Sequence, residues 1–316
     1  PLVFAPFLKH VIWGGTKICE YKGIESPASD IGESWEISVL PGQESVVEKG
    51  EYEGYTLSRL AERFGELLLG KKINEKYGGK FPLLIKFIDA HDRLSVQVHP
   101  DDELARQRHN SLGKSELWYI VAAAPCAKIY VGLKKEVSPN EFMRHVEQGS
   151  LEEVLAEWDS VPGDVFFLPA GRIHAIGAGN LLVEIQESSD VTYRIYDYDR
   201  RDSHGNPRPL HTAEARDAID YTVQKDYKGE PVTDLTKEKE LVSCEHFTTR
   251  YYRITSPRPL PCSPDSFTVV ICISGEITVS CRDGEETIRA GHTLLIPAIA
   301  SLARISGNGS VLVTQG

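Results

Sequence analysis

The sequence lacks a long apolar segment and lacks a recognisable targeting signal. No stretch of 18 or more residues is uninterruptedly apolar, so we expect no transmembrane helix. The first residues, PLVFAPFLKHVIWGG, do not have the order of charged, apolar and small residues that marks a signal peptide. The sequence therefore predicts a cytoplasmic protein that does not bind membranes.

Basic residues are outnumbered by acidic ones, and the few cysteines are scattered along the chain. The 316 residues include 35 Lys and Arg against 46 Asp and Glu, a formal net charge of −11. Nucleic acids and anionic membranes require basic patches, so this balance argues against both as partners, although a few local basic residues suffice for one small anion. The six cysteines include no C-x-x-C pair, which is typical of reduced thiols in a cytosolic chain.

Helical periodicity is also scarce, and most of the chain is typical of short β-strands. Strand patterns lie at 33–40, 82–90, 93–100, 116–124, 127–133, 164–170 and 180–187. Their number and spacing predict a mainly β fold built from jelly-roll barrels. Helices are expected at 56–70, at 138–158 with a break at Gly149, and at 211–222.

An internal repeat predicts two related β units. The segments GDVFFLPAGRIHAI (163–176) and GHTLLIPAIASLARI (291–305) share Gly, a strand pattern, Pro and Ala in register. Counting on from Pro-Ala places Leu302 opposite His174. A polar stretch at 227–240 is expected to link the units. We therefore expect a catalytic unit at 1–230 and a degenerate C-terminal unit at 241–316 without a metal site.

The segment RLSVQVHPDD carries polar residues at strand spacing. A period of two places Ser95, Gln97 and His99 on one face and Val96 and Val98 on the other. The polar face is expected to line a cavity between two covered faces. A Gln-x-His pair on its own is, however, more often a surface or hydrogen-bonded pair than a set of metal ligands.

Two later residues strengthen the prediction of a metal site. Glu116 begins a strong strand, and His174 follows a tight turn that begins at Pro169. Two histidines, a carboxylate and the amide of Gln97 suit a divalent metal with an open coordination position. This donor set favours a catalytic site over a structural zinc site, which is usually closed by Cys and His.

These motifs resemble known families. The pattern G-x5-P-x-G-x2-H, met by Gly163, Pro169, Gly171 and His174, resembles the second metal motif of the cupin superfamily, although Gln97 stands where cupins have their first histidine. The chain more narrowly resembles the short bacterial form of type I mannose-6-phosphate isomerase. The segments that carry this resemblance are IWGG, GESWEIS, PLLIKFIDA, LSVQVHPDD, GKSELWYI, PAGRIHAIG and ESSDVTYRIYDYDR.

The resemblance implies a cupin-like fold, an activity and a set of site residues. It implies one Zn²⁺ per chain bound by Gln97, His99, Glu116 and His174, with Arg194 as an active-site arginine. The implied reaction interconverts mannose 6-phosphate and fructose 6-phosphate, a small-molecule sugar phosphate pair, through an enediolate. Moving a proton between C1 and C2 requires stabilisation of that enediolate and a general base.

The remaining site residues are assigned by analogy and by environment. Glu184 is the candidate base, because the family has a glutamate ten residues before the arginine; a solvent-facing strand glutamate is the alternative. Ser95 and Lys114 resemble family residues near the substrate. Lys86 lies in an apolar run, so it either faces the cavity or extends its ammonium to solvent. The sequence does not decide which of Lys86, Lys114 and Arg194 bind the phosphate group of the substrate.

Two other functions fit the same scaffold. A cupin oxygenase would bind Fe²⁺, but the glutamine at 97 and the nearby basic residues favour the isomerase. A non-catalytic sugar-binding cupin is the second alternative, especially for the C-terminal unit. Zinc, manganese and cobalt all suit the site, and either a monomer or a homodimer is expected.

Overall fold

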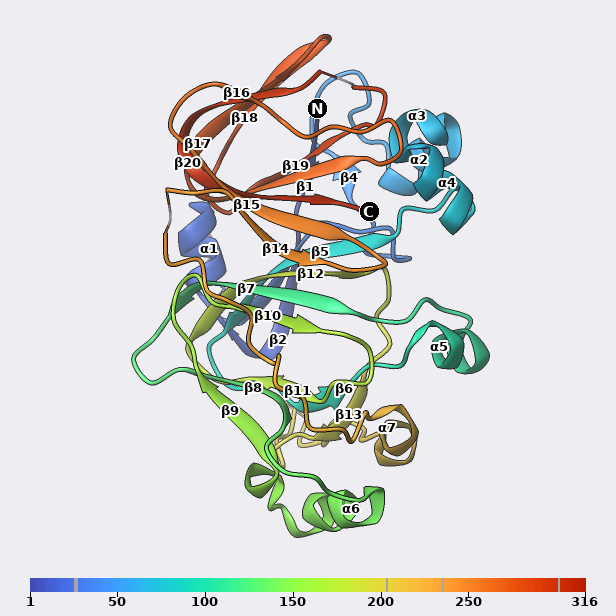
Figure 1. Cartoon of the computed structure of the whole chain (residues 1–316), viewed down its shortest axis with the longest axis vertical. Coiled ribbons are helices and arrows are strands. Elements are labelled where there is room, and N and C mark those ends of the chain that lie inside the picture. The colour runs from blue at the N-terminus through green and yellow to red at the C-terminus, as the bar shows by residue number, and fades with distance from the viewer. Residues whose placement is uncertain (26–27, 203, 235, 301) are drawn as a thin grey trace.

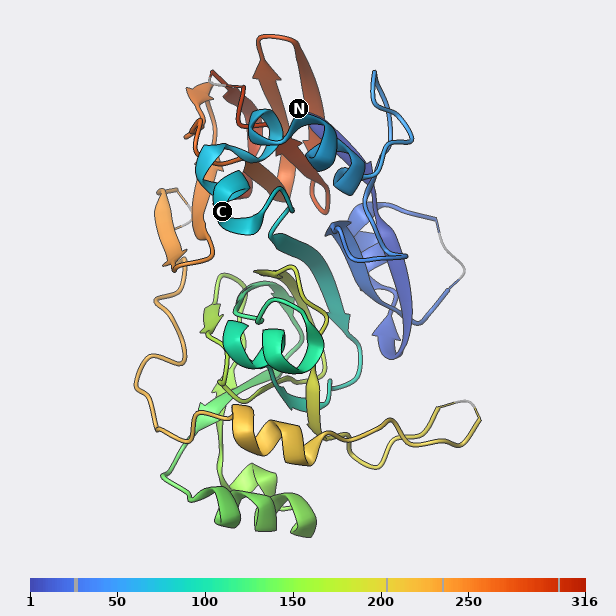
Figure 2. The same ribbon diagram turned by 90° about the vertical axis from the view of Figure 1, so that its right-hand side faces the viewer.

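Three antiparallel sheets form the framework of this computed structural model, which describes every residue except 26–27, 203, 235 and 301 (Figures 1 and 2). The prediction of a mainly β, cupin-like fold is confirmed. The described strands form open sheets, however, and none of these sheets closes into a barrel. The sheets are stacked along the long axis of the molecule, as Figure 1 shows.

The six-stranded sheet lies in the middle of the stack. Its strands are, in spatial order, β10 (Val165–Leu168), β7 (Glu116–Ala123), β12 (Asn180–Glu187), β5 (Leu83–Ala90), β3 (Ile31–Ile37) and β2 (Phe7–Gly15). Every residue of β5 and β12 is buried. Strands covered on both faces explain why the predicted strands at 82–90 and 180–187 read as nearly continuous apolar runs.

The five-stranded sheet packs against one face of this central sheet. Its strands are β13 (Tyr193–Tyr196), β6 (Val96–Val98), β11 (His174–Ile176), β8 (Lys128–Leu133) and β9 (Leu155–Asp159). The shared core of the two sheets includes Ile120, Leu182, Ile129 and Val131. The candidate ligands come from both sheets, so the site is built between two layers rather than on one.

The nine-stranded sheet covers the other face. It contains β14 (Lys239–Ser243), β15 (Thr248–Ile254), β20 (Arg304–Gln315), β17 (Thr268–Cys281), β19 (Thr293–Ile296), β1 (Leu2–Ala5) and β4 (Val46–Val47), with β16 (Arg258–Pro259) beside β20 and β18 (Gly284–Arg289) beside β17. Contacts such as the stacked rings of Tyr119 and Tyr251, 6.3 Å apart, join it to the central sheet.

The N-terminal strand joins the C-terminal sheet. β1 pairs with β19 through Leu2–Leu295 and Val3–Leu294. The polar segment at 227–240 passes along β10, where the Gly229 N–H donates to the Val165 carbonyl. The division of the chain into units at 1–230 and 241–316 therefore stays a prediction, and the strand pairing of β1 crosses it.

The helices lie at the periphery of the sheets. They are α1 (Lys17–Lys22), α2 (Leu57–Phe64), α3 (Glu66–Leu69), α4 (Lys71–Tyr77), α5 (Asp102–His109), α6 (Pro139–Gln148), the 3₁₀ turn η1 (Leu151–Glu153) and α7 (Thr212–Ala218). Gly65, at φ 48°, separates α2 from α3 within the single helix expected at 56–70. Among the described helices, none has the length and apolarity that crossing a bilayer requires.

Both segments of the predicted repeat contain a strand that is followed by a second strand. These strands are β10 and β11 in the first segment, and β19 and the start of β20 in the second. Leu302 lies before β20 and is 82% exposed, whereas His174 begins β11 and is buried. The correspondence of Leu302 with His174 stays a prediction.

Candidate metal centre

Three strands bring the predicted ligands together. Gln97 is the middle residue of β6, His99 follows that strand, His174 begins β11, and Glu116 begins β7 in the facing sheet. Gln97 lies directly opposite His174 in the strand pairing. The expected alternation is confirmed, because Val96 and Val98 on the other face belong to an apolar core.

The ligand atoms form a compact buried group. The carboxylate of Glu116 lies 3.2 Å from His99 Nε2 through Oε1 and 3.7 Å from His174 Nε2 through Oε2. The two imidazole centroids are 4.8 Å apart. The amide of Gln97 lies 3.3 Å from His174 Nε2 through its nitrogen, and a 180° rotation of the amide presents its oxygen instead.

Backbone carbonyls orient both imidazoles. His99 Nδ1 donates to the Val191 carbonyl at 2.9 Å, and His174 Nδ1 donates to the Arg172 carbonyl at 2.8 Å. Each ring therefore carries its proton on Nδ1 and presents the lone pair of Nε2 to Glu116. This arrangement is the one by which proteins fix metal-binding histidines.

The electrostatics keep both histidines neutral and the carboxylate charged. Burial, and next Lys114, lowers the pKa of His99 to about 4, and burial likewise lowers the pKa of His174. Burial alone would raise the pKa of Glu116, but the Lys114 ammonium is the largest of the influences that hold it well below its usual value. Neutral imidazoles and an ionised carboxylate are the protonation states that metal binding requires.

The residues present fit a divalent cation. Both oxygens of Glu116 are buried and neither accepts a hydrogen bond. The Lys114 ammonium lies 2.6 Å from Glu116 Oε1 and 3.1 Å from His99 Nε2, so a positive charge already stands against two of the ligand atoms. The His99, Glu116 and His174 donors suit a transition metal better than magnesium or calcium, which prefer oxygen ligands alone.

Glu184 and Lys86 form a buried ion pair beside the cluster. Lys86 Nζ lies 2.9 Å from Glu184 Oε2, and the side chains are 5% and 4% exposed. Trp118 Nε1 donates to Glu184 Oε1 at 3.0 Å, while the Trp118 ring packs edge-on against His174. The charge of Glu184 raises the pKa of Lys86 against the opposing effect of burial. Neither side chain extends into solvent; their roles stay predictions.

Arg194 and Ser95 lie on the five-stranded side. Arg194 is paired with Gln97 in the β13–β6 ladder, so His174, Gln97 and Arg194 are consecutive across the sheet. Its Nη1 donates to the Pro209 carbonyl, and its Nε is buried without a hydrogen bond. Ser95 is 3% exposed. The structure therefore brings Arg194 next to the ligand row and leaves part of its guanidinium unpaired.

The sequence motifs did not single out Trp118 as a residue of the site. In the structure it is the side chain that joins His174 to Glu184. Its position two residues after Glu116 on β7, and therefore on the same face, is the signal that identifies it. Gln186 was also missed as a neighbour; it lies opposite Glu116 in the β12–β7 ladder, two residues after Glu184.

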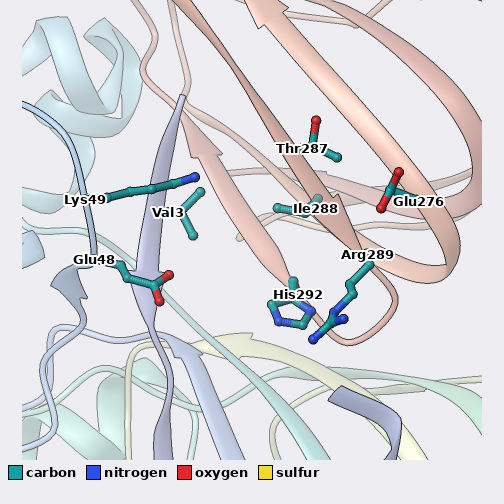
Figure 3. A pocket seen from close by; sticks show the side chains of 8 residues that line it. All are labelled: Val3, Glu48, Lys49, Glu276, Thr287, Ile288, Arg289 and His292. Atoms are coloured by element: carbon teal, nitrogen blue, oxygen red, sulfur yellow. The ribbon is translucent and has the colours of Figure 1, made fainter. Parts of the chain in front are cut away.

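A cavity of about 420 Å³ lies elsewhere (Figure 3). It is lined by residues of β1, β17 and β18 and of neighbouring loops: Val3, Glu48, Lys49, Glu276, Thr287, Ile288, Arg289 and His292. Its walls mix acidic and basic side chains, and Lys49 is itself paired with Glu286. The cavity shares no residue with the metal-ligand cluster.

Comparisons with known proteins agree on one family. Residues 2–119 match the catalytic domain of type I phosphomannose isomerase, and residues 237–315 match the cupin domain of mannose-6-phosphate isomerase. The mannose-6-phosphate isomerase ManA of Bacillus subtilis is 34% identical over 100% of this chain and 98% of its own length. The mannose-6-phosphate isomerase of Streptococcus mutans is 33% identical over the same shares.

Solved structures have the same fold. The crystal structure of the mannose 6-phosphate isomerase from Bacillus subtilis superposes with a TM-score of 0.88 at 33% identity, covering 99% of both chains. A mutant of phosphomannose isomerase from Salmonella typhimurium has a TM-score of 0.80 at 15% identity, over 99% of this chain and 98% of its own. At that lower identity the similarity concerns the fold alone.

Proposed function

Because this chain belongs to the type I mannose-6-phosphate isomerase family and is an isomerase, we propose that it interconverts mannose 6-phosphate and fructose 6-phosphate with one zinc ion bound at the candidate metal centre. The observation that carries the proposal is the buried group of His99, Glu116 and His174, whose ligand atoms lie within 4.8 Å of one another. Gln97 is proposed as the fourth ligand, because it lies directly opposite His174.

A bound metal ion would stabilise the enediolate, which is the main requirement of the reaction. A zinc ion held by these four residues would supply Lewis-acid stabilisation of the negative charge that develops on the sugar oxygens. Lys114 adds a second positive charge at the same place, since its ammonium contacts Glu116 and His99. The protein layers on both sides keep the cluster out of bulk water, which strengthens each of these interactions.

Glu184 is proposed as the base that carries the proton between C1 and C2. Lys86 and Trp118 support this role, because the ammonium favours the carboxylate and the indole N–H fixes its orientation. Glu184 Oε2 contacts the Lys86 ammonium at 2.9 Å, and a carboxylate oxygen has a second lone pair that can take the substrate's proton. The same carboxyl group would take the proton from one carbon and return it to the other.

The substrate phosphate and the enediolate both need positive charge. Lys86 and Lys114 are engaged by carboxylates, whereas Arg194 has a buried Nε without a hydrogen bond. Arg194 is therefore the proposed holder of negative charge on the substrate, with Ser95, Lys86 and Lys114 as further contacts. The cytoplasmic location and a monomeric or homodimeric state stay predictions.

The first test is the reaction itself. Purified protein is incubated with mannose 6-phosphate, and fructose 6-phosphate is followed by a coupled assay. Turnover is expected, with loss of activity after treatment with a chelator and recovery on addition of zinc.

A matched variant separates metal binding from other effects. His174→Ala removes one of the proposed imidazole ligands, so we expect it to lose both bound zinc and turnover. His292→Ala, in the separate cavity, is expected to keep both. No turnover by the wild-type protein, or turnover that a chelator does not affect, would contradict the proposal.

A further inference from the structure

A second group of ligand side chains lies away from the proposed zinc centre. Asp102 is at the start of α5, Glu187 ends β12, and His246 lies in the turn between β14 and β15. Their ligand atoms all lie within 4.8 Å of one another. The three residues come from segments far apart in the sequence, so only the folded chain assembles them.

Glu187 has one oxygen bonded and one unpaired. Oε1 accepts from the Ser115 N–H at 2.9 Å. Oε2 accepts no hydrogen bond, although the side chain is only 2% exposed. It lies 3.1 Å from His246 Nδ1, which is also buried and without a hydrogen bond. Neither of these two buried polar atoms has a hydrogen bond, which costs free energy unless a third group satisfies both.

The surroundings leave negative charge uncompensated. Among the ion pairs of the described residues, Asp102 has none, and Glu187 has only the contact with His246. The nearby Lys76 contacts Glu245 instead. A cation at this point would relieve the repulsion between the two carboxylates.

We infer that Asp102, Glu187 and His246 form a second binding site, for a divalent transition metal such as Zn²⁺. Two ligand atoms each about 2.1 Å from one zinc ion lie roughly 3.0–3.4 Å apart, which matches the separation of Glu187 Oε2 and His246 Nδ1. One imidazole and two carboxylates form a donor set that zinc accepts. Asp102 is exposed, so water reaches the site and completes the coordination.

A metal ion bound at this site would cross-link two sheets. His246 belongs to a hairpin of the nine-stranded sheet, and Glu187 belongs to the central sheet. Glu187 is also bonded through its own backbone N–H to the Ser115 carbonyl. A metal ion here therefore links the C-terminal sheet to the segment that precedes Glu116, and its role is structural rather than catalytic.

The test counts zinc ions. The full-length protein is stripped with a chelator, reloaded with Zn²⁺ and freed of excess metal, and zinc per chain is measured by mass spectrometry together with the unfolding temperature. Two zinc ions per chain are expected for the wild type. His246→Ala and Asp102→Asn should bind one and unfold at a lower temperature when loaded, while the neighbouring Glu245→Gln should bind two.

The variants keep the test independent of misfolding and of the proposed function. Asp102 is exposed, and asparagine preserves an oxygen acceptor for the Gly113 N–H. His174→Ala should lose only the other ion. The inference is overturned if both His246→Ala and Asp102→Asn still bind two ions. It is also overturned if the wild type binds no zinc, or if the wild type binds a single ion and His246→Ala still binds it. A single ion lost in His246→Ala but kept in His174→Ala would support this site and contradict the catalytic zinc centre.

Discussion

At the scale of single residues, the site depends on how its polar atoms are paired. The imidazoles of His99 and His174 use Nδ1 for backbone carbonyls, so Nε2 of each ring points toward Glu116. Glu116 is surrounded by Lys114 and the two histidines rather than by hydrogen-bond donors of the backbone. The orientation of the imidazoles and the position of Glu116 therefore preorganise a cation-binding site.

Replacing Glu184 tests the proposed base. Glu184→Gln keeps the shape and the hydrogen bond from Trp118 but removes the proton acceptor. We expect kcat to fall by about 100-fold or more, with little change in KM and no loss of zinc. Steady-state kinetics and zinc analysis of the variant provide the measurement.

Trp118→Phe is the matched control, since it keeps an aromatic ring but removes the indole N–H that orients the same carboxylate, together with part of the ring. A fall in kcat of less than about tenfold is expected for it. If Glu184→Gln turns over at a near-normal rate, Glu184 is not the base.

At the scale of elements, the turn between β10 and β11 positions His174. Gly171 has φ +85°, and its N–H donates to the His99 carbonyl, so one turn ties together the segments of two ligands. A Cβ at this position would lie 3.0 Å from the Ala218 carbonyl oxygen. Both the backbone conformation and the close approach therefore require glycine.

Gly171→Ala tests this element. We expect a loss of about 1–2 kcal/mol in unfolding free energy from the conformation, with an added cost from the Ala218 contact and weaker zinc binding. Urea unfolding and zinc titration measure the two effects.

Gly42→Ala is the control, because Gly42 has φ +78° and open space around its Cβ position. It should show the conformational cost alone and normal zinc binding. Equal losses in the two variants, with zinc affinity unchanged in both, would show that the turn does not position His174.

At the scale of the whole molecule, the metal centre lies between layers and therefore affects global stability. Burial between the two sheets lowers the pKa of His99 to about 4, against about 6.5 in an unfolded chain. Between these pH values the unfolded chain binds more protons than the folded one, so stability rises with pH and falls on acidification. The depressed pKa of Glu116 acts in the same direction at lower pH.

The metal-free protein should accordingly lose stability as the pH falls from about 6.5 towards 4. For His99 the difference in pKa corresponds to about 3 kcal/mol. Urea unfolding at successive pH values measures the effect. His99→Gln removes this titration and should flatten the dependence; an unchanged slope in that variant would assign the acid sensitivity to other groups.

The sequence by itself determined the local features of this protein. Period-two alternation placed Gln97 and His99 on one strand face, and the ordered motifs predicted the family, because strand periodicity and short motifs are encoded by neighbouring residues. The number and spacing of the strand patterns likewise predicted a mainly β fold, although the predicted barrels are open sheets in the described part of the chain.

Only the tertiary structure decided which distant residues meet. The pairing of Lys86 with Glu184 and the bridge through Trp118 both depend on strand register. The grouping of Glu187 with His246 depends on the packing of two sheets. Such contacts are set by long-range packing, which the spacing of residues along the chain does not contain.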